Sequence, residues 1–157
     1  MNAVIVISAL ILTFQLVKPR MFLASRYAEP RMIQVGEKLH LPGEIAHENA
    51  LVMVLQKGCR YCAASAPFYR KLAGTATVLD RVHLIAVLPQ DVPVSRAYLS
   101  SLGVPISDVR QVSLTSIEAP YTPMLLLIDR SSVVRDVWIG VLSPERQEQV
   151  LSKLTSN

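Results

Sequence analysis

The sequence has few of the residues from which metal sites and disulfide networks are built. Among its 157 residues there are two cysteines, Cys59 and Cys62, and three histidines. A structural zinc site would need two more ligands beside the cysteines. The histidines, His40, His47 and His83, are scattered and have no ligand-like spacing. We therefore expect no metal, and a zinc site is the weaker alternative.

An excess of charge of one sign is also missing. The formal net charge is only +4 at pH 7, and the basic residues are dispersed along the chain. A nucleic-acid-binding surface needs a basic stripe or patch. We therefore expect no nucleic-acid partner. The chain also lacks internal repeats and low-complexity tracts, and its hydrophobic content of 51% is sufficient for one domain with a core.

One long apolar run lies at the N-terminus, over residues 3–17. Counted from Met1, it barely reaches the roughly 17–25 residues with which a helix spans a bilayer. We predict that it is an uncleaved single-pass anchor in the cell membrane. A cleaved signal peptide is one alternative, although no small-x-small cleavage site follows convincingly. A buried core helix is the other alternative.

The anchor prediction divides the chain into an anchor or signal segment at 1–20, a tether at 21–34 and a folded domain at 35–157. The charge pattern bears on orientation, because Lys18 and Arg20 follow the apolar run. The positive-inside rule by itself would then place the domain in the cytoplasm.

The two cysteines lie three residues apart, between the apolar run 51–55 and a helix-like segment at 63–73. A buried strand thus delivers Cys59 to the start of a helix, where unpaired N–H groups and the helix dipole favour a thiolate. Cysteines one helical turn apart can also close a disulfide. The pattern predicts a C-x-x-C redox pair. A purely structural disulfide is the alternative, although so short a loop constrains the unfolded chain little.

The rest of the chain predicts an alternation of strands and helices. Expected strands lie at 82–88, 109–114, 124–128 and 133–138, expected helices at 94–102 and after Ser143, and a short leading strand or hairpin at 35–41. The last two strands are joined by a polar turn and should pair as a hairpin. This order of elements implies a mixed sheet sandwiched by helices.

With these landmarks in order, the chain resembles the thioredoxin fold. The cysteine pair follows the first core strand, Pro67 matches the family's helix-kinking proline, and residues 140–143 resemble its glycine turn into the final helix. Thr122-Pro123 resembles the family's cis-proline opposite the active site. The resemblance covers residues 50–157. It implies a three-layer α/β/α sandwich with a mixed central sheet, preceded by an N-terminal hydrophobic helix.

The leading segment, an insertion around residues 94–114 and the apolar N-terminus resemble one branch of that family. This is the TlpA-like branch of membrane-anchored thiol–disulfide oxidoreductases of the bacterial cell envelope. The resemblance implies protein disulfide or dithiol substrates, a redox partner protein, and no cofactor beyond the redox-active disulfide. It also implies that the domain lies on the periplasmic or extracytoplasmic side, against the charge pattern.

The resemblance further implies roles for the residues of the motif. Cys59 is the expected nucleophile and Cys62 the resolving thiol, which releases the mixed disulfide. Arg60 either lowers the pKa of Cys59 by its charge or is a solvated surface charge. Tyr61 either shapes the contact surface for substrate or covers the helix start.

Thr122 and Pro123 are expected to bind substrate, again by resemblance. A cis-proline would keep an irregular backbone edge beside the sulfurs, free to pair with an extended substrate segment. The alternative is an ordinary proline at the start of a strand.

Three positions depart from the family pattern. Gly58 stands where the family usually has tryptophan, Met53 where thioredoxins carry a buried acid, and Ser65 where some TlpA-like reductases have glutamate. No carboxylate is thus available at these places to move a proton to or from Cys62. These departures favour the alternative function, a thioredoxin-fold binding or scaffold protein with weak or no redox turnover.

Overall fold

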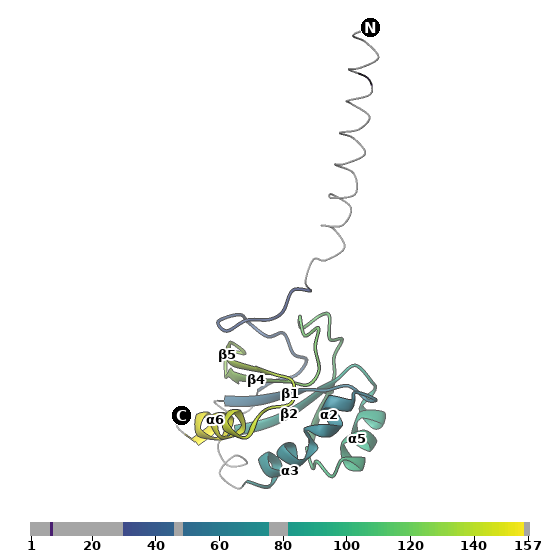
Figure 1. Cartoon of the computed structure of the whole chain (residues 1–157), viewed down its shortest axis with the longest axis vertical. Coiled ribbons are helices and arrows are strands. Elements are labelled where there is room, and N and C mark those ends of the chain that lie inside the picture. The colour runs from purple at the N-terminus through teal and green to yellow at the C-terminus, as the bar shows by residue number, and fades with distance from the viewer. Residues whose placement is uncertain (1–6, 8–29, 46–48, 76–81, 156–157) are drawn as a thin grey trace. The chain divides into compact units, whose positions relative to one another are not determined.

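A five-stranded mixed sheet forms the centre of the structure (Figure 1), a computed structural model that describes Ile7 and residues 30–45, 49–75 and 82–155. The strand order is β3-β2-β1-β4-β5. The strands are β1 (Asn49–Val54), β2 (Val82–Leu88), β3 (Asp108–Gln111), β4 (Met124–Asp129) and β5 (Val134–Ile139). β1, β2 and β3 run parallel, and β4 is antiparallel to both β1 and β5. The predicted mixed sheet and its terminal hairpin are confirmed.

The helices of the described residues gather on one side of the sheet (Figure 1). They are α2 (Arg60–Ala64), α3 (Ala66–Gly74), α5 (Val92–Ser101) and α6 (Pro144–Thr155). The connections β1–β2 and β2–β3 step in the same direction across the sheet, so right-handed crossovers place α2, α3 and α5 on the same face. The predicted break in the first helix is confirmed, because Pro67 lies in the first turn of α3.

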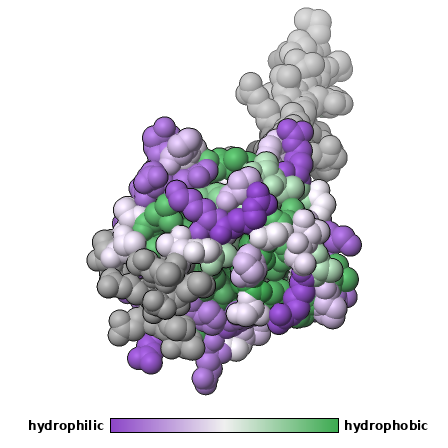
Figure 2. Space-filling model, turned by 90° about the horizontal axis from the view of Figure 1, so that it is seen from below, coloured by the Kyte–Doolittle hydropathy of each residue, from purple (hydrophilic) through white to green (hydrophobic). Residues whose placement is uncertain are grey.

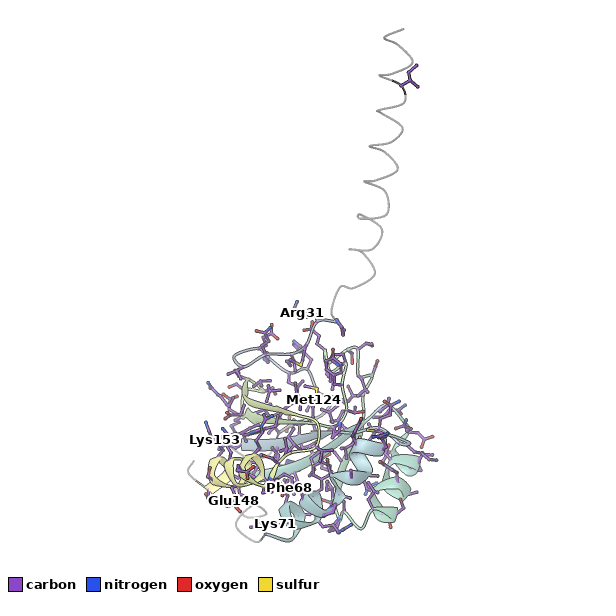
Figure 3. The ribbon with its side chains drawn as sticks, viewed as in Figure 1. Arg31, Phe68, Lys71, Met124, Glu148 and Lys153 are labelled. Carbon is purple, nitrogen blue, oxygen red and sulfur yellow. The ribbon has the colours of Figure 1, made fainter. Side chains whose placement is uncertain are left out.

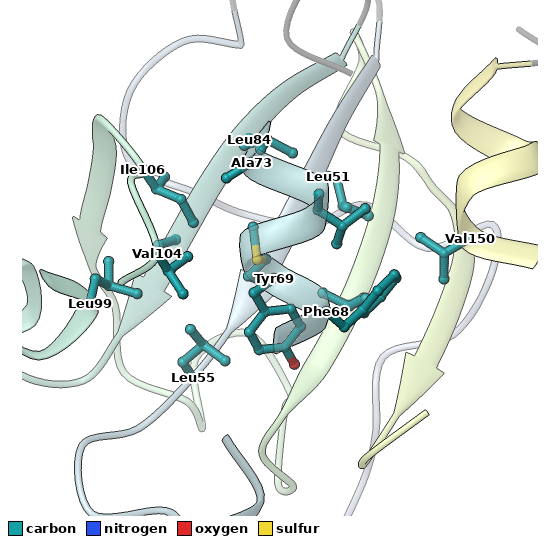
Figure 4. Close-up of a cluster of buried hydrophobic side chains, with 14 of the residues drawn as sticks. Leu51, Leu55, Phe68, Tyr69, Ala73, Leu84, Leu99, Val104, Ile106 and Val150 are labelled. Carbon is teal, nitrogen blue, oxygen red and sulfur yellow. The ribbon is translucent and has the colours of Figure 1, made fainter. Parts of the chain in front are cut away.

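Alternate residues of each strand point to the two faces, which divides the core into two clusters. On the helical face, Figure 4 shows Phe68 and Tyr69 of α3 between Leu99 of α5 and Val150 of α6. Lys71 of α3 also lies near Glu148 of α6, with 3.9 Å between Nζ and Oε1 (Figure 3). From below, apolar surface is visible only in patches between hydrophilic side chains (Figure 2).

The opposite face of the sheet is covered by irregular segments, with no helix among the residues that the structure describes. Its buried residues include Val52, Met124 and Leu126 of the sheet. Ile33 and Leu39 from the leading segment and Ile117 and Ala119 from the β3–β4 connection pack against them. The compact unit that contains the sheet runs from Arg31 to Asn157.

The leading strand expected at 35–41 does not form. Gly36 has a φ of 91°, in the left-handed region that favours glycine, and a turn closes from Glu37 N–H to Gln34 O at 3.1 Å. Sheet pairing is therefore reduced to one isolated bridge between Lys38 and Val133. The strand expected at 109–114 is also shorter, because β3 ends at Gln111.

The predicted location is wrong. No helix of the described residues is both long and apolar enough to cross a membrane. The longest of them, α6, has 12 residues, and a membrane-spanning helix needs about 20. This finding overturns the expectation of a single-pass anchor with the domain on the periplasmic or extracytoplasmic side. Residues 3–17, on which that expectation rests, lie outside the described residues except for Ile7.

Arg110 of β3 ties the leading segment to the edge of the sheet. Its guanidinium donates to the backbone oxygens of Pro42 at 2.7 Å and Glu44 at 2.9 Å. It also donates twice to the Asp108 carboxylate, at 2.9 and 2.7 Å, and Asp108 lies 3.2 Å from His83 Nε2. The Arg110 side chain is only 12% exposed, so its loss would remove two hydrogen bonds from the part-buried Asp108 carboxylate and one each from the Pro42 and Glu44 oxygens.

We expect Arg110→Ala to lower the free energy of unfolding by about 2–3 kcal/mol, because hydrogen bonds to a charged group are each worth about 1.5–3 kcal/mol. Denaturant unfolding of purified protein measures this. Arg135→Ala is the matched control, since Arg135 pairs with Asp129 at a site where its side chain is 57% exposed and should lose less than about 1 kcal/mol. Equal losses in the two variants would contradict the role assigned to Arg110.

Candidate active site

A tight turn after β1 presents the first cysteine. The Leu55 N–H still donates to Val87 O at 2.9 Å, so pairing with β2 continues one residue past the strand. The turn then closes from Cys59 N–H to Gln56 O at 3.2 Å, and Gly58 has a φ of 83°. A residue with a side chain would be strained at this φ, so the turn favours glycine at position 58.

Cys59 is the N-cap of α2. Its Sγ accepts a hydrogen bond from the Cys62 backbone N–H at 3.1 Å, and its backbone oxygen accepts from Ala63 N–H at 3.2 Å. A sulfur in this position takes the place of the Ser, Thr or Asp oxygen that usually caps a helix. The Cys59 side chain is partly exposed, whereas Cys62 is completely buried.

The two thiols differ in acidity. Burial by itself raises the pKa of the Cys59 thiol, but hydrogen bonds from Cys62, Thr122 and the backbone N–H groups of Cys62 and Tyr61 outweigh it, so this pKa lies below that of a free thiol. Burial raises the pKa of Cys62 to about 12, and its hydrogen bond with Cys59 adds to the rise. The pair therefore combines a more acidic, partly exposed thiol with a less acidic, buried one.

Thr122 and Pro123 lie beside the exposed cysteine. The Cys59 Sγ is 3.5 Å from the Thr122 backbone oxygen, and the Thr122–Pro123 peptide bond is cis. The Pro123 oxygen accepts from Gly140 N–H at 2.8 Å, which joins this segment to the turn before α6. The structure thus brings together the cysteine motif and the proline segment, which are far apart in the sequence.

Arg60 and Tyr61 contact each other rather than the sulfurs. The Arg60 Cζ lies 4.7 Å from the centre of the Tyr61 ring, and Tyr61 is 51% exposed. The interactions that lower the pKa of Cys59 come from Cys62, Thr122 and the Tyr61 backbone, and the Arg60 charge is not among them. Their roles in substrate binding stay predictions.

The positions that lack a carboxylate are buried in the structure. Met53 is part of the helical-face core, and Ser65 donates from Oγ to the Tyr61 oxygen at 2.9 Å. No cluster of metal-ligating side chains occurs in the part of the chain that the structure describes.

Two tyrosines near the cysteines are not found by sequence reasoning. Burial raises the pKa of Tyr69, and the Ser65 side chain offsets this only in part. Burial and then the negative charges of Cys62 and Cys59 raise the pKa of Tyr98. Helical spacing predicts that Tyr98 faces inward, but it does not say against which residue.

Solved structures share this architecture, and several of them are named as thiol–disulfide proteins. StoA from Bacillus subtilis has a TM-score of 0.57 and 16% identity, over 82% of this chain and 99% of that chain. A thiol-disulfide isomerase from Corynebacterium glutamicum has a TM-score of 0.56 and 16% identity, over 82% of this chain and 98% of that chain. A thiol:disulfide interchange protein of the thioredoxin family from Chlorobium tepidum has a TM-score of 0.54 and 17% identity, over 69% of this chain and 81% of that chain.

The fold is thioredoxin-like. This confirms the fold that the motif spacing implied. No protein-family model and no curated protein matches the sequence, and at these identities the likeness to solved structures establishes the fold alone.

We expect a limiting amount of iodoacetamide at neutral pH to label Cys59 and leave Cys62 unlabelled. A lowered pKa gives Cys59 a larger thiolate fraction than a free thiol has at the same pH, and the raised pKa keeps Cys62 a thiol. Peptide mass spectrometry after a pH series measures both sites. Denatured protein is the control and should label both cysteines alike, whereas preferential labelling of Cys62 in folded protein would reverse the assigned roles.

Proposed function

We propose that this protein is a thiol–disulfide oxidoreductase that exchanges disulfides with protein substrates through Cys59 and Cys62. The observation that carries the proposal is the asymmetry of the pair. Cys59 is partly exposed and has a lowered pKa, and Cys62, one turn inside, is buried and has a raised pKa. A nucleophile and a resolving thiol need these opposite properties.

The reaction follows from this division of roles. The Cys59 thiolate attacks one sulfur of a substrate disulfide, which forms a mixed disulfide and releases the other substrate sulfur as a thiolate. Cys62 then loses its proton to water and attacks the Cys59 Sγ. The Cys59–Cys62 disulfide forms, and the second substrate sulfur leaves as a thiolate that takes a proton from water. Two electrons pass from the protein to the substrate, and the reverse sequence oxidises a dithiol.

The chain needs no cofactor for this chemistry beyond its own cysteine pair, but it needs a redox partner protein that resets the pair. The Thr122–Pro123 segment is the proposed contact for an extended substrate chain, since the Thr122 oxygen lies 3.5 Å from the reacting sulfur. Tyr61 and Tyr121 are 51% and 49% exposed, and we propose that they and Arg60 extend this contact surface. The likeness to solved structures that are named as thiol–disulfide proteins supports the proposal for the folded domain.

A binding or scaffold protein is the second candidate. It is favoured by one observation, the burial of Met53 and Ser65 at the two places where related enzymes carry a carboxylate. Without such an acid, release of the mixed disulfide by Cys62 would be slow. The two candidates therefore differ in turnover rather than in whether Cys59 reacts.

We expect the reduced wild-type protein to reduce insulin disulfides with multiple turnovers in the presence of dithiothreitol. Cys59→Ser should abolish turnover, because no nucleophile remains. Cys62→Ser, reduced and then freed of dithiothreitol, should form the mixed disulfide and stall, so that a covalent adduct with substrate accumulates on non-reducing gels. A wild-type protein that forms adducts but shows no turnover above dithiothreitol alone would favour the scaffold.

A further inference from the structure

Two positively charged side chains flank the reacting sulfur. Lys57 lies two residues before Cys59, and Arg60 directly follows it. Both are exposed, and Cys59 itself is partly exposed. Because consecutive Cα atoms are about 3.8 Å apart, the Cα atoms of Lys57 and Arg60 lie within about 8 Å of that of Cys59. A molecule that reaches the sulfur therefore comes close to both charges.

The Arg60 guanidinium is positioned by an aromatic ring and not by a carboxylate. Its Cζ lies 4.7 Å from the centre of the Tyr61 ring, and Tyr61 is 51% exposed. Stacking on a ring occupies the face of a guanidinium and leaves the N–H groups at its edge available to acceptors. No carboxylate of the described residues forms an ion pair with Arg60. Its charge is therefore presented to solvent beside Cys59.

Lys57 also forms no ion pair with a carboxylate in the part of the chain that the structure describes. Its backbone N–H donates to Gln90 Oε1 at 3.3 Å, which brings Asp91 into the neighbourhood. The Asp91 carboxylate is engaged elsewhere, because its Oδ1 accepts from the Val94 N–H at 2.8 Å as the N-cap of α5. A capping carboxylate interacts with the positive end of its own helix. Asp91 thus leaves the Lys57 charge unpaired.

The other side of the site, formed by residues 119–123, carries no charged side chain. Tyr121 in this segment is 49% exposed. The carboxylate that precedes the segment, Glu118, pairs with Arg31, with 2.8 Å between Oε2 and Nε. Positive charge is therefore in excess where the described residues border Cys59.

We propose that this site prefers protein disulfides whose cysteines are flanked by acidic residues. The inference rests on the proposed function and deepens it, because it names the substrate class. Lys57 and Arg60 would attract carboxylates that flank the substrate cysteine, and they would repel lysine at the same positions. Such complementarity acts mainly on the rate of encounter and on the choice of partner.

The chemistry of the exchange is the same for every substrate. The Cys59 thiolate attacks one sulfur of the substrate disulfide, the sulfur–sulfur bond of the substrate breaks, and a mixed disulfide forms. The other half of the substrate leaves as a thiolate and takes a proton from water. The flanking charges therefore change how fast a disulfide reacts and not what is formed.

Three matched probes test the preference. They are disulfide-linked dimers of the peptide acetyl-Gly-X-Cys-X-Gly-amide, in which X is glutamate, glutamine or lysine. The second-order rate constant for oxidation of the reduced wild-type protein by each dimer is measured by acid quenching and chromatography. Each value is divided by the rate constant of the same dimer with 2-mercaptoethanol, a neutral thiol, which corrects for the reactivity of the peptide itself.

We expect the normalised rate constant to be about fivefold or more higher for the glutamate dimer than for the lysine dimer at low salt, which is the effect of one pair of unit charges about 4 Å apart in water. The ratio should approach one at about 1 M salt, where the Debye length falls to about 3 Å. The glutamine dimer should lie between the other two.

Lys57→Gln and Arg60→Gln should each lower the glutamate-to-lysine ratio, and the double variant should bring it close to one. A change in the acidity of Cys59 would alter all three rate constants together, so the ratio reports the charges alone. Arg130→Gln is the matched control and should keep the wild-type ratio. Arg130 is exposed and follows the end of β4, whereas the site adjoins the beginning of this strand, about 20 Å away at about 3.4 Å per residue.

Equal normalised rate constants for the three dimers in the wild-type protein would overturn the inference, and so would a ratio that persists in the double variant. A charge effect found with oxidised glutathione but not with the peptides would also overturn it, in favour of small anionic disulfides. Wild-type turnover of insulin is measured in parallel. Its absence would remove the proposed function, whereas turnover with equal peptide rates would remove only the preference for acidic substrates.

A second measurement uses the wild-type protein and does not depend on disulfide exchange. Iodoacetate is an anion and iodoacetamide is neutral, so the ratio of their rates of alkylation at Cys59 reports the local charge. Added salt screens charges. It should raise this ratio for the thiolate of free cysteine, which repels iodoacetate, and lower it for Cys59, where Lys57 and Arg60 attract iodoacetate. A ratio at Cys59 that rises with salt as it does for free cysteine would overturn the inference.

Discussion

The pairing of β1 on both of its edges is the constraint on which the rest of the structure depends. β1 is hydrogen-bonded to β2 on one side and to β4 on the other, and its residues from Ala50 to Val54 are fully buried. A shift of register by one residue would exchange Leu51 and Met53 with Ala50 and Val52 between the two core clusters, so both clusters would have to repack. Its end is therefore a rigid point, and the turn through Gly58 presents Cys59 from there.

Helix packing then gives Cys59 and Cys62 different solvent exposure and different thiol pKa values. Cys59 caps α2 and stays partly in contact with solvent, whereas Cys62 points into the cluster between the sheet and the helices. Hydrogen bonds to a thiolate lower the pKa of the first, and burial raises that of the second. The difference does not require a charged residue, because Arg60 lies over the Tyr61 ring.

The two faces of the sheet are stabilised in different ways. Helices cover one face, and the leading segment and the β3–β4 connection cover the other without a helix among the described residues. Irregular segments leave many backbone N–H and C=O groups without the hydrogen bonds that helices and strands provide. The Arg110 side chain supplies two of these bonds, to the backbone oxygens of Pro42 and Glu44. At this edge, side-chain hydrogen bonds thus pair backbone groups that helical hydrogen bonds pair on the other face.

The sequence by itself determined the order of strands and helices from residue 49 onwards, the cysteine pair at the start of a helix and the break at Pro67. These features are local, since they follow from apolar runs, spacing and proline geometry within a few residues. It did not determine the turn at Gly36, which prevents a leading strand, or a membrane location. Only the tertiary structure decided that the Thr122 oxygen lies beside the Cys59 sulfur and that the Arg60 guanidinium packs on the Tyr61 ring. Those contacts join residues between one and more than sixty positions apart, and they depend on side-chain directions and helix packing, which hydrophobic periodicity does not specify.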